Sequence, residues 1–77
     1  MRFIYIKGKN LTHDALAEAF AFPPHYGRNL DALFDCLTEI AAHTMIVLTD
    51  SDQADGRFLN VIRAAVAENP RLCIVMM

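Results

Sequence analysis

The chain has 77 residues, 55% of them hydrophobic, which predicts a single domain over residues 1–77 and argues against disorder. Its formal net charge of −2 argues against a general nucleic-acid binder, which normally carries a basic excess. No run of 18 apolar residues and no signal-peptide pattern is present, so we expect a cytoplasmic protein that does not bind membranes.

The first elements in chain order are a strand and a helix. Residues 2–6 are apolar and rich in β-forming types, which predicts a buried strand. After a polar break, Thr12 is a suitable N-cap for a helix over residues 13–20. The Pro23–Pro24 pair is expected to end this helix, because the residue before a proline avoids the α region.

A loop over residues 22–28 leads to a second predicted helix. Gly27 is expected to give the loop backbone freedom that other residues lack. Asn29 is a suitable N-cap for a helix over residues 30–41. The apolar positions of this helix recur at helical spacing and predict a buried face. They are Leu30, Leu33, Phe34 and Leu37.

The rest of the chain predicts a strand, a helix and a strand. Residues 44–48 are almost continuously apolar, as in the strands of a parallel sheet that helices cover. A helix is expected over residues 56–68, where Asn69–Pro70 stops it, and a last strand over residues 72–77. This alternation predicts an α/β fold, with a three-stranded parallel β-sheet packed with helices in the order β-α-α-β-α-β.

The sequence carries no motif for catalysis or for binding a metal or cofactor. It lacks the nucleophile-elbow, P-loop and dinucleotide-binding patterns, so we expect no enzymatic activity, no metal and no cofactor. Cys36 and Cys73 do not form a C-x-x-C pair and are expected to be reduced, packed thiols. Asp35 is expected to raise the pKa of the neighbouring Cys36 thiol, because its charge repels the thiolate.

Three acids recur every four residues along the second predicted helix, and we call Asp31, Asp35 and Glu39 the acidic ridge. Side chains at this spacing are neighbours, so their like charges repel. No basic residues stand at the matching spacings to offset the repulsion. The helix dipole stabilises the negative charge of Asp31 in the first turn, whereas Asp35 lies in mid-helix and is not stabilised in this way. The ridge is therefore either a solvated face or a surface that meets a positively charged partner.

A longer motif around the ridge favours the second interpretation. The run Y-G-x-N-L-D-A-L-x-D-x-L-T, residues 26–38, resembles the signature loop and second helix of the barstar family of ribonuclease inhibitors. The predicted order of strands and helices is similar to that family along essentially the whole chain. The resemblance implies a single barstar-like domain whose loop and second helix block the active site of a small basic ribonuclease.

The resemblance also implies roles for individual residues. Asp35 would be the central anchor, with its carboxylate where a substrate phosphate binds, and Asp31 would make a second charged contact. Tyr26 would either touch the partner or pack inward and brace the loop, and Phe34 would belong either to the interface or to the core. The implied partner-binding residues are His25, Tyr26, Gly27, Arg28, Asn29, Asp31, Phe34, Asp35, Thr38 and Glu39.

Several positions depart from the family's pattern. Arg28 puts a positive charge where the family prototype has an acid, Ala64 replaces an acid of the last helix, and His25 stands where a tyrosine is frequent. The loop before the last helix is also shorter. A histidine in a binding loop titrates near neutrality, so His25 is expected to make binding pH-dependent. These changes predict a different partner specificity, with Glu39 partly compensating the lost negative charge.

Two functions remain open on these residues. The first is an intracellular bacterial inhibitor of a small basic ribonuclease, that is, an immunity protein or antitoxin. The second is a barstar-like interaction module that binds a basic protein other than a nuclease and inhibits nothing. In both cases we expect a monomer whose partner is a protein, without direct contact to nucleic acid.

Overall fold

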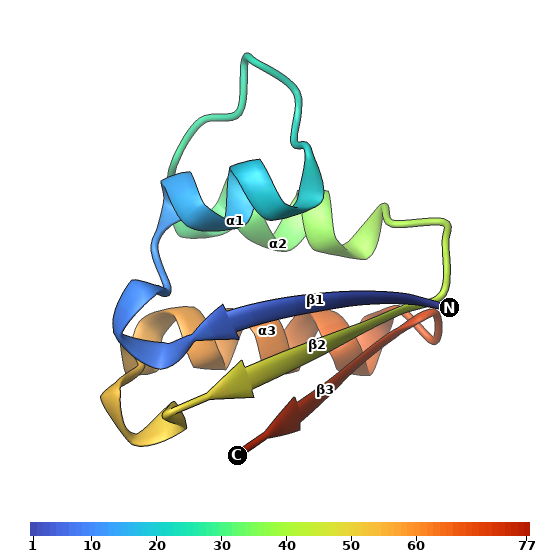
Figure 1. The fold of residues 1–77 in the computed structure, drawn as a ribbon. Helices are drawn as coiled ribbons and strands as arrows, with labels where there is room; N and C mark the ends of the chain where they lie inside the picture. Colours follow the sequence, from blue (N-terminus) through green and yellow to red (C-terminus); the bar gives the residue numbers. More distant parts are fainter.

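The computed structural model describes residues 1–77, and its strands and helices follow the predicted order (Figure 1). None of the helices has the length and apolar character that a bilayer crossing requires. Two of the elements, η1 and η2, are short 3-10 turns. The elements are β1 (Arg2–Lys7), η1 (Gly8–Asn10), α1 (His13–Phe20), α2 (Leu30–Thr38), β2 (Thr44–Thr49), η2 (Ser51–Gln53), α3 (Gly56–Glu68) and β3 (Leu72–Met76).

The three strands form one parallel sheet in the order β1-β2-β3. Both crossovers step in the same direction across the sheet, and connections of this kind are right-handed. All three helices therefore lie on one face of the sheet, with α3 behind the strands in the view of Figure 1. The predicted α/β fold and its order β-α-α-β-α-β are confirmed.

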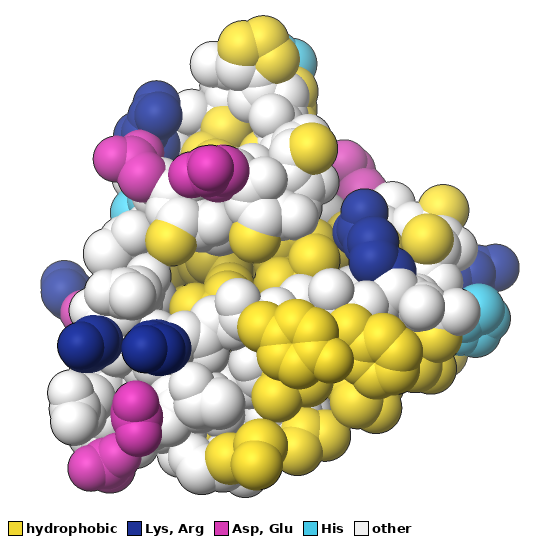
Figure 2. All heavy atoms as spheres, viewed as in Figure 1, with side chains coloured by type: hydrophobic (Ala, Val, Ile, Leu, Met, Phe, Trp, Pro, Cys, Tyr) yellow, Lys and Arg dark blue, Asp and Glu magenta, His cyan; other side chains and the backbone are white.

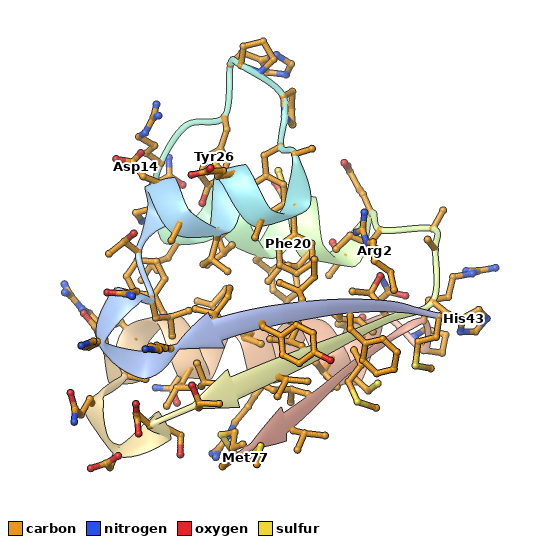
Figure 3. The ribbon with its side chains drawn as sticks, viewed as in Figure 1. Arg2, Asp14, Phe20, Tyr26, His43 and Met77 are labelled. Atoms are coloured by element: carbon orange, nitrogen blue, oxygen red, sulfur yellow. The ribbon has the colours of Figure 1, made fainter.

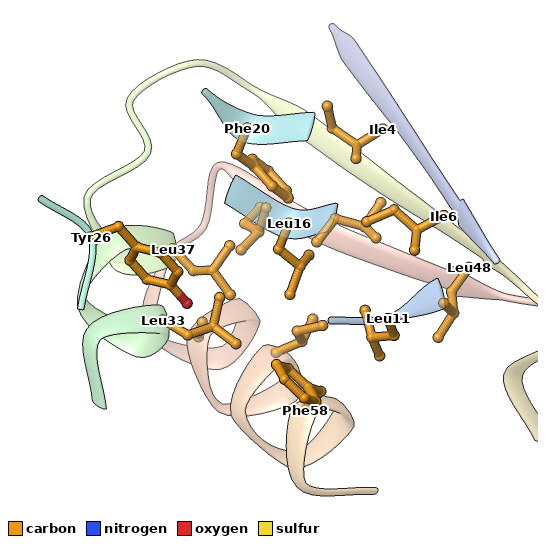
Figure 4. Packing of buried hydrophobic residues seen from close by; sticks show 14 residues of the cluster. Ile4, Ile6, Leu11, Leu16, Phe20, Tyr26, Leu33, Leu37, Leu48 and Phe58 are labelled. Atoms are coloured by element: carbon orange, nitrogen blue, oxygen red, sulfur yellow. The ribbon is translucent and has the colours of Figure 1, made fainter. Parts of the chain in front are cut away.

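The core lies between the sheet and the helices (Figure 4). Alternate strand residues point to opposite faces of a sheet. The buried apolar strand residues are Ile4, Ile6, Ile46, Leu48 and Leu72, and Thr44 of β2 is buried as well. The helices contribute buried side chains from the opposite side, among them Leu16, Phe20, Leu33, Leu37, Phe58 and Ile62. Each large side chain that is fully buried in this way stabilises the fold by about 1.5–3 kcal/mol.

The second face of the sheet carries no helix. Met45 and Val47 of β2 point to this side and are only half-buried, and Phe3 and Tyr5 of β1 are exposed there. The expectation that helices cover the sheet is therefore correct for one face only. The reason is topological, because strands added in sequential order place every right-handed crossover on the same side.

The predicted helix caps are confirmed. The Thr12 hydroxyl oxygen accepts a hydrogen bond from the amide of Ala15 (3.1 Å), and Asn29 Oδ1 accepts one from the amide of Ala32 (2.8 Å). The end of α1 has a different cause from the one predicted. Ala21 adopts a left-handed conformation with φ 55° and closes the helix before the proline pair is reached.

The end of α2 differs from the prediction, since the helix stops at Thr38 rather than at residue 41. The cause is Asn69, which follows α3 and is only 4% exposed. Its side-chain amide donates hydrogen bonds to the carbonyl oxygens of Leu37 and Ile40, both at 3.0 Å. Carbonyls at a helix end lack partners within the helix, so a residue distant in sequence satisfies them and fixes the boundary.

Candidate functional site

The loop before α2 projects from the helices and is the uppermost segment in Figure 1. Pro23, Pro24 and His25 in this loop are exposed. Tyr26 is only 7% exposed, and its ring lies against that of Phe22 with the ring centroids 4.9 Å apart. Of the two roles predicted for Tyr26, its position fits inward packing that braces the loop.

His13 of α1 connects this loop to the rest of the helical layer. A hydrogen bond of 2.7 Å joins its Nδ1 to the hydroxyl of Tyr26, which points toward α1 in Figure 3. The His13 ring also lies edge-on to Phe58 of α3, with ring centroids 4.7 Å apart. Burial is the main cause that raises the pKa of Tyr26, so the phenol is neutral at physiological pH and keeps this bond.

Arg28 makes the backbone turn that leads the loop into α2, with φ 50°. Its Nε donates a hydrogen bond of 2.7 Å to Asp14 Oδ1 in the first turn of α1. No glycine has a positive φ, so the conformational role predicted for Gly27 is wrong, and Arg28 takes the left-handed position instead. The ion pair is exposed at the surface, and it compensates the positive charge that Arg28 brings into the loop.

The acidic ridge lies on the solvent side of α2. The leucines of this helix face the core, while all three ridge carboxylates belong to exposed residues. Glu39 is the residue that ends α2, and its amide donates a hydrogen bond to the carbonyl of Asp35. Both ion pairs of the structure lie elsewhere, so no cation of this chain neutralises the ridge. The helix therefore presents fixed, unpaired negative charge.

The other predicted contact residues on α2 have structural roles as well. Phe34 is half-buried and packs against the core, which leaves part of the side chain accessible. The Thr38 hydroxyl donates a hydrogen bond of 3.0 Å to the carbonyl of Asp35. Asn29 is exposed but its side chain is engaged in the helix cap. The ridge, Phe34 and Thr38 thus share one helix, and His25 stands on the loop before it.

Cys36 lies on α2 beside the ridge and is half-buried. Burial raises the pKa of its thiol, and the carboxylates of Glu39 and Asp35 raise it further. The predicted direction is confirmed, although burial and not Asp35 is the largest cause. A protonated thiol is a poor nucleophile. No group of three His, Cys, Asp or Glu side chains is arranged to hold a metal ion.

Sequence reasoning missed three residues that position the loop and α2, namely His13, Asp14 and Asn69. Each acts through a side chain that reaches across more than a dozen positions of the chain. Local spacing carries no sign of such contacts. The only sequence signal for the Asp14–Arg28 pair was that the two residues carry opposite charges and lie near the two ends of residues 13–28, the first helix and the loop after it.

Comparison with known proteins defines the class to which this fold and site belong. The chain matches the family described as Barstar (barnase inhibitor) over residues 1–69. The chain therefore belongs to the barstar family. It is 51% identical over 43 residues to the putative ribonuclease inhibitor YrdF of Bacillus subtilis (strain 168). That alignment covers 49% of this chain and 47% of the relative, so the chain spans about half the length of the curated relative it matches.

Proposed function

We propose that this chain inhibits a small basic ribonuclease by placing α2 and the loop before it in the active site of the enzyme. The observation that carries the proposal is the acidic ridge, with three exposed carboxylates and no cation of the chain paired to them. Like charges at this spacing cost stability, and a basic partner would supply the missing opposite charge. Family membership and the name of the Bacillus relative support a ribonuclease as that partner.

Carboxylates on a packed helix suit an active site that binds phosphates. Arginine and lysine side chains that hold phosphate also bind carboxylates, and arginine does so through two parallel hydrogen bonds. Asp35, near the middle of α2, is the proposed central contact, with Asp31 and Glu39 on either side of it. Opposite electrostatic fields would also accelerate the encounter of the ridge with a basic enzyme.

The loop sets the orientation of the ridge in this proposal. Tyr26 and Asn29 hold the loop and the first turn of α2 from within, while Gly27 keeps the backbone accessible to the partner. His25 and the accessible part of Phe34 supply contact surface at the edge of the ridge. The pairing of Arg28 with Asp14 keeps the guanidinium on the α1 side of the loop.

The biological setting that fits this function is a bacterial cytoplasm. An inhibitor kept there would protect cellular RNA from a ribonuclease made by the same cell, which is the role of an immunity protein or antitoxin. The bacterial origin of the relative supports this setting.

A second candidate function is an interaction module that binds a basic protein other than a nuclease without inhibiting it. Arg28 and Ala64 favour this candidate, because they stand where the resemblance implies acids and so alter the face that would fit the family's ribonucleases. Partner capture from cell extract that depends on Asp35 and yields no nuclease would select this candidate.

An RNA-cleavage assay with a panel of small basic ribonucleases tests the proposal. The native chain is expected to inhibit at least one of them at one-to-one stoichiometry. Asp35→Ala should weaken that inhibition by at least about 100-fold, because interfacial charge pairs of this kind couple by several kcal/mol. Inhibition by Asp35→Ala equal to that of the native chain would contradict the role of the ridge.

The matched control is Asp52→Ala, which removes one exposed carboxylate from η2, outside the ridge. It lowers the net negative charge of the chain by the same amount as Asp35→Ala. Inhibition by Asp52→Ala should stay within about threefold of the native level, since surface substitutions outside a contact change free energies by about 0.5 kcal/mol or less.

A further inference from the structure

The face of the sheet opposite to the helices is a second exposed surface, and it is apolar. We call it the outer sheet face. In register, its residues form two rows across the three strands, Phe3–Met45–Cys73 and Tyr5–Val47–Val75. A third row begins with Lys7 and Thr49, so the face is apolar at one end and polar at the other.

The outer sheet face is large for exposed apolar surface. Phe3 is 50% exposed, Tyr5 is 72% exposed, and Met77 beside β3 is 70% exposed. Figure 2 shows the hydrophobic side chains gathered over the strands. Met1 and Val75 are also exposed. If a large side chain has a full area of about 150–250 Å², the exposed parts of these five side chains add up to roughly 450–750 Å². The largest apolar patch on a typical monomer measures about 300–600 Å² and is often functional, and larger patches mark interaction sites.

We propose that the outer sheet face is the contact surface between two copies of this chain. A face-to-face pair would enclose roughly 900–1,500 Å² in total, which reaches the range of about 1,200–2,000 Å² for stable interfaces. Both copies would bring the same apolar rows, as a two-fold interface requires. The inference departs from the monomer expected from the sequence, because the sequence did not reveal that one face of the sheet is uncovered.

The side chains on this face are complementary to themselves. A two-fold axis parallel to the strands places β1 of one copy over β3 of the other. Phe3 and Tyr5, whose stacked rings lie 6.3 Å apart between centroids, then face the smaller Cys73 and Val75 of the second copy. Large side chains over small ones fill the space of about 10 Å between packed sheets.

Lys7 selects this orientation of the axis. It is the only charged side chain in the three rows, and it stands at their polar end. With the axis parallel to the strands, both copies keep Lys7 at the same end of the interface, where it reaches solvent. With the axis perpendicular to the strands, Lys7 would lie over Phe3 of the second copy, and its charge would lose water without gaining a partner.

The pairing leaves the acidic ridge accessible, because α2 packs on the opposite face of the sheet. A pair would therefore carry two ridges. The proposal does not depend on which protein the ridge binds, and it can be tested without any nuclease.

Sedimentation equilibrium over a range from low micromolar to near-millimolar concentration tests the pairing. The native mass should rise from 8.6 kDa toward twice that value. The dissociation constant should fall inside this concentration range. Tyr5→Lys and Val75→Lys should each weaken pairing at least about tenfold, because each adds a charge to the buried contact. A native chain that stays at 8.6 kDa at the highest concentration would overturn the proposal.

Two controls separate pairing from folding. Tyr5 and Val75 are exposed, so at concentrations where the native chain is a monomer both lysine variants should keep its circular dichroism spectrum and melting temperature. Ala67→Lys adds the same charge to an exposed position of α3 and should pair as the native chain does. NMR shift changes on dilution should be confined to β1, β2 and β3. Changes centred on α2, or lysine variants that pair normally, would count against the outer sheet face.

Discussion

At the scale of single residues, Asn69 has a larger structural role than any side chain of the acidic ridge. It is buried, and all polar atoms of its side chain are hydrogen-bonded. Its amide nitrogen donates to the carbonyls of Leu37 and Ile40, and its side-chain oxygen accepts from the amide of Arg71 at 3.0 Å. One side chain thereby joins the end of α2 to the turn before β3. The position of Glu39, next to these carbonyls, depends on this arrangement.

Replacing Asn69 by alanine should lower the free energy of unfolding by about 1–3 kcal/mol, the cost of removing the donor to the Ile40 carbonyl and one of the two donors to the Leu37 carbonyl. Urea unfolding followed by circular dichroism measures this difference. Asn60→Ala, at an exposed position of α3, is the matched control and should change the free energy by no more than about 0.5 kcal/mol. Equal stability of the two variants would show that the Asn69 bonds do not stabilise α2.

At the scale of elements, the molecule depends on a connection between α1, the loop before α2 and α3. His13 makes this connection through its bond to the Tyr26 hydroxyl and its contact with Phe58. The loop has few other attachments, of which the Arg28–Asp14 ion pair lies at the exposed surface. Exposed ion pairs contribute little to stability, so the buried tyrosine is the main constraint on the loop.

Tyr26→Phe should therefore lower the free energy of unfolding by about 0.5–1.5 kcal/mol at neutral pH, the usual contribution of one hydrogen bond. Hydrogen exchange of the amides of residues 22–28 should become faster. Tyr5→Phe removes an exposed hydroxyl and is the control. Unchanged exchange in Tyr26→Phe would contradict the bracing role.

Tyr26→Phe and Tyr5→Phe should also differ in how their free energy of unfolding depends on pH. Burial raises the folded-state pKa of Tyr26, so the folded state disfavours the phenolate. The stability linked to this group is complete below the unfolded pKa of about 10 and is lost as the pH rises toward the folded pKa. The native chain should lose stability relative to Tyr26→Phe above that pH, whereas the Tyr5→Phe variant should follow the native chain.

Local signals predicted most of the elements, because caps and periodicity act within a few residues. Thr12 and Asn29 bond to amides three positions away, and both were found from sequence. The end of α2 was not found from sequence, because its carbonyls bond to the distant Asn69. The left-handed conformation of Arg28 was not found either, and its side chain bonds to a residue of another helix. The acidic ridge was identified from spacing alone, whereas its lack of a cationic partner required the fold.

At the scale of the whole molecule, the two faces of the fold differ in chemistry. The helical layer carries the acidic ridge and the loop, which projects from it in Figure 1, while the outer sheet face presents the apolar side chains seen in Figure 2. The apolar pattern of the strands could not reveal this difference, because near-continuous apolar strands are typical of a sheet that is covered on both faces. Separate faces allow the chain to bind a basic protein and a second copy at once.

If the ridge carboxylates occupy the phosphate sites of a ribonuclease, a mononucleotide bound in the active site must compete with this chain. The measurement is the apparent dissociation constant between this chain and a nuclease that it inhibits, at increasing concentrations of a nucleoside monophosphate bound in the active site. Competition should raise the apparent constant by a factor of one plus the ratio of the nucleotide concentration to the dissociation constant of the nucleotide, and Asp52→Ala should behave in the same way. A constant that does not change while the nucleotide saturates the enzyme would show that the ridge binds elsewhere, and it would contradict the account.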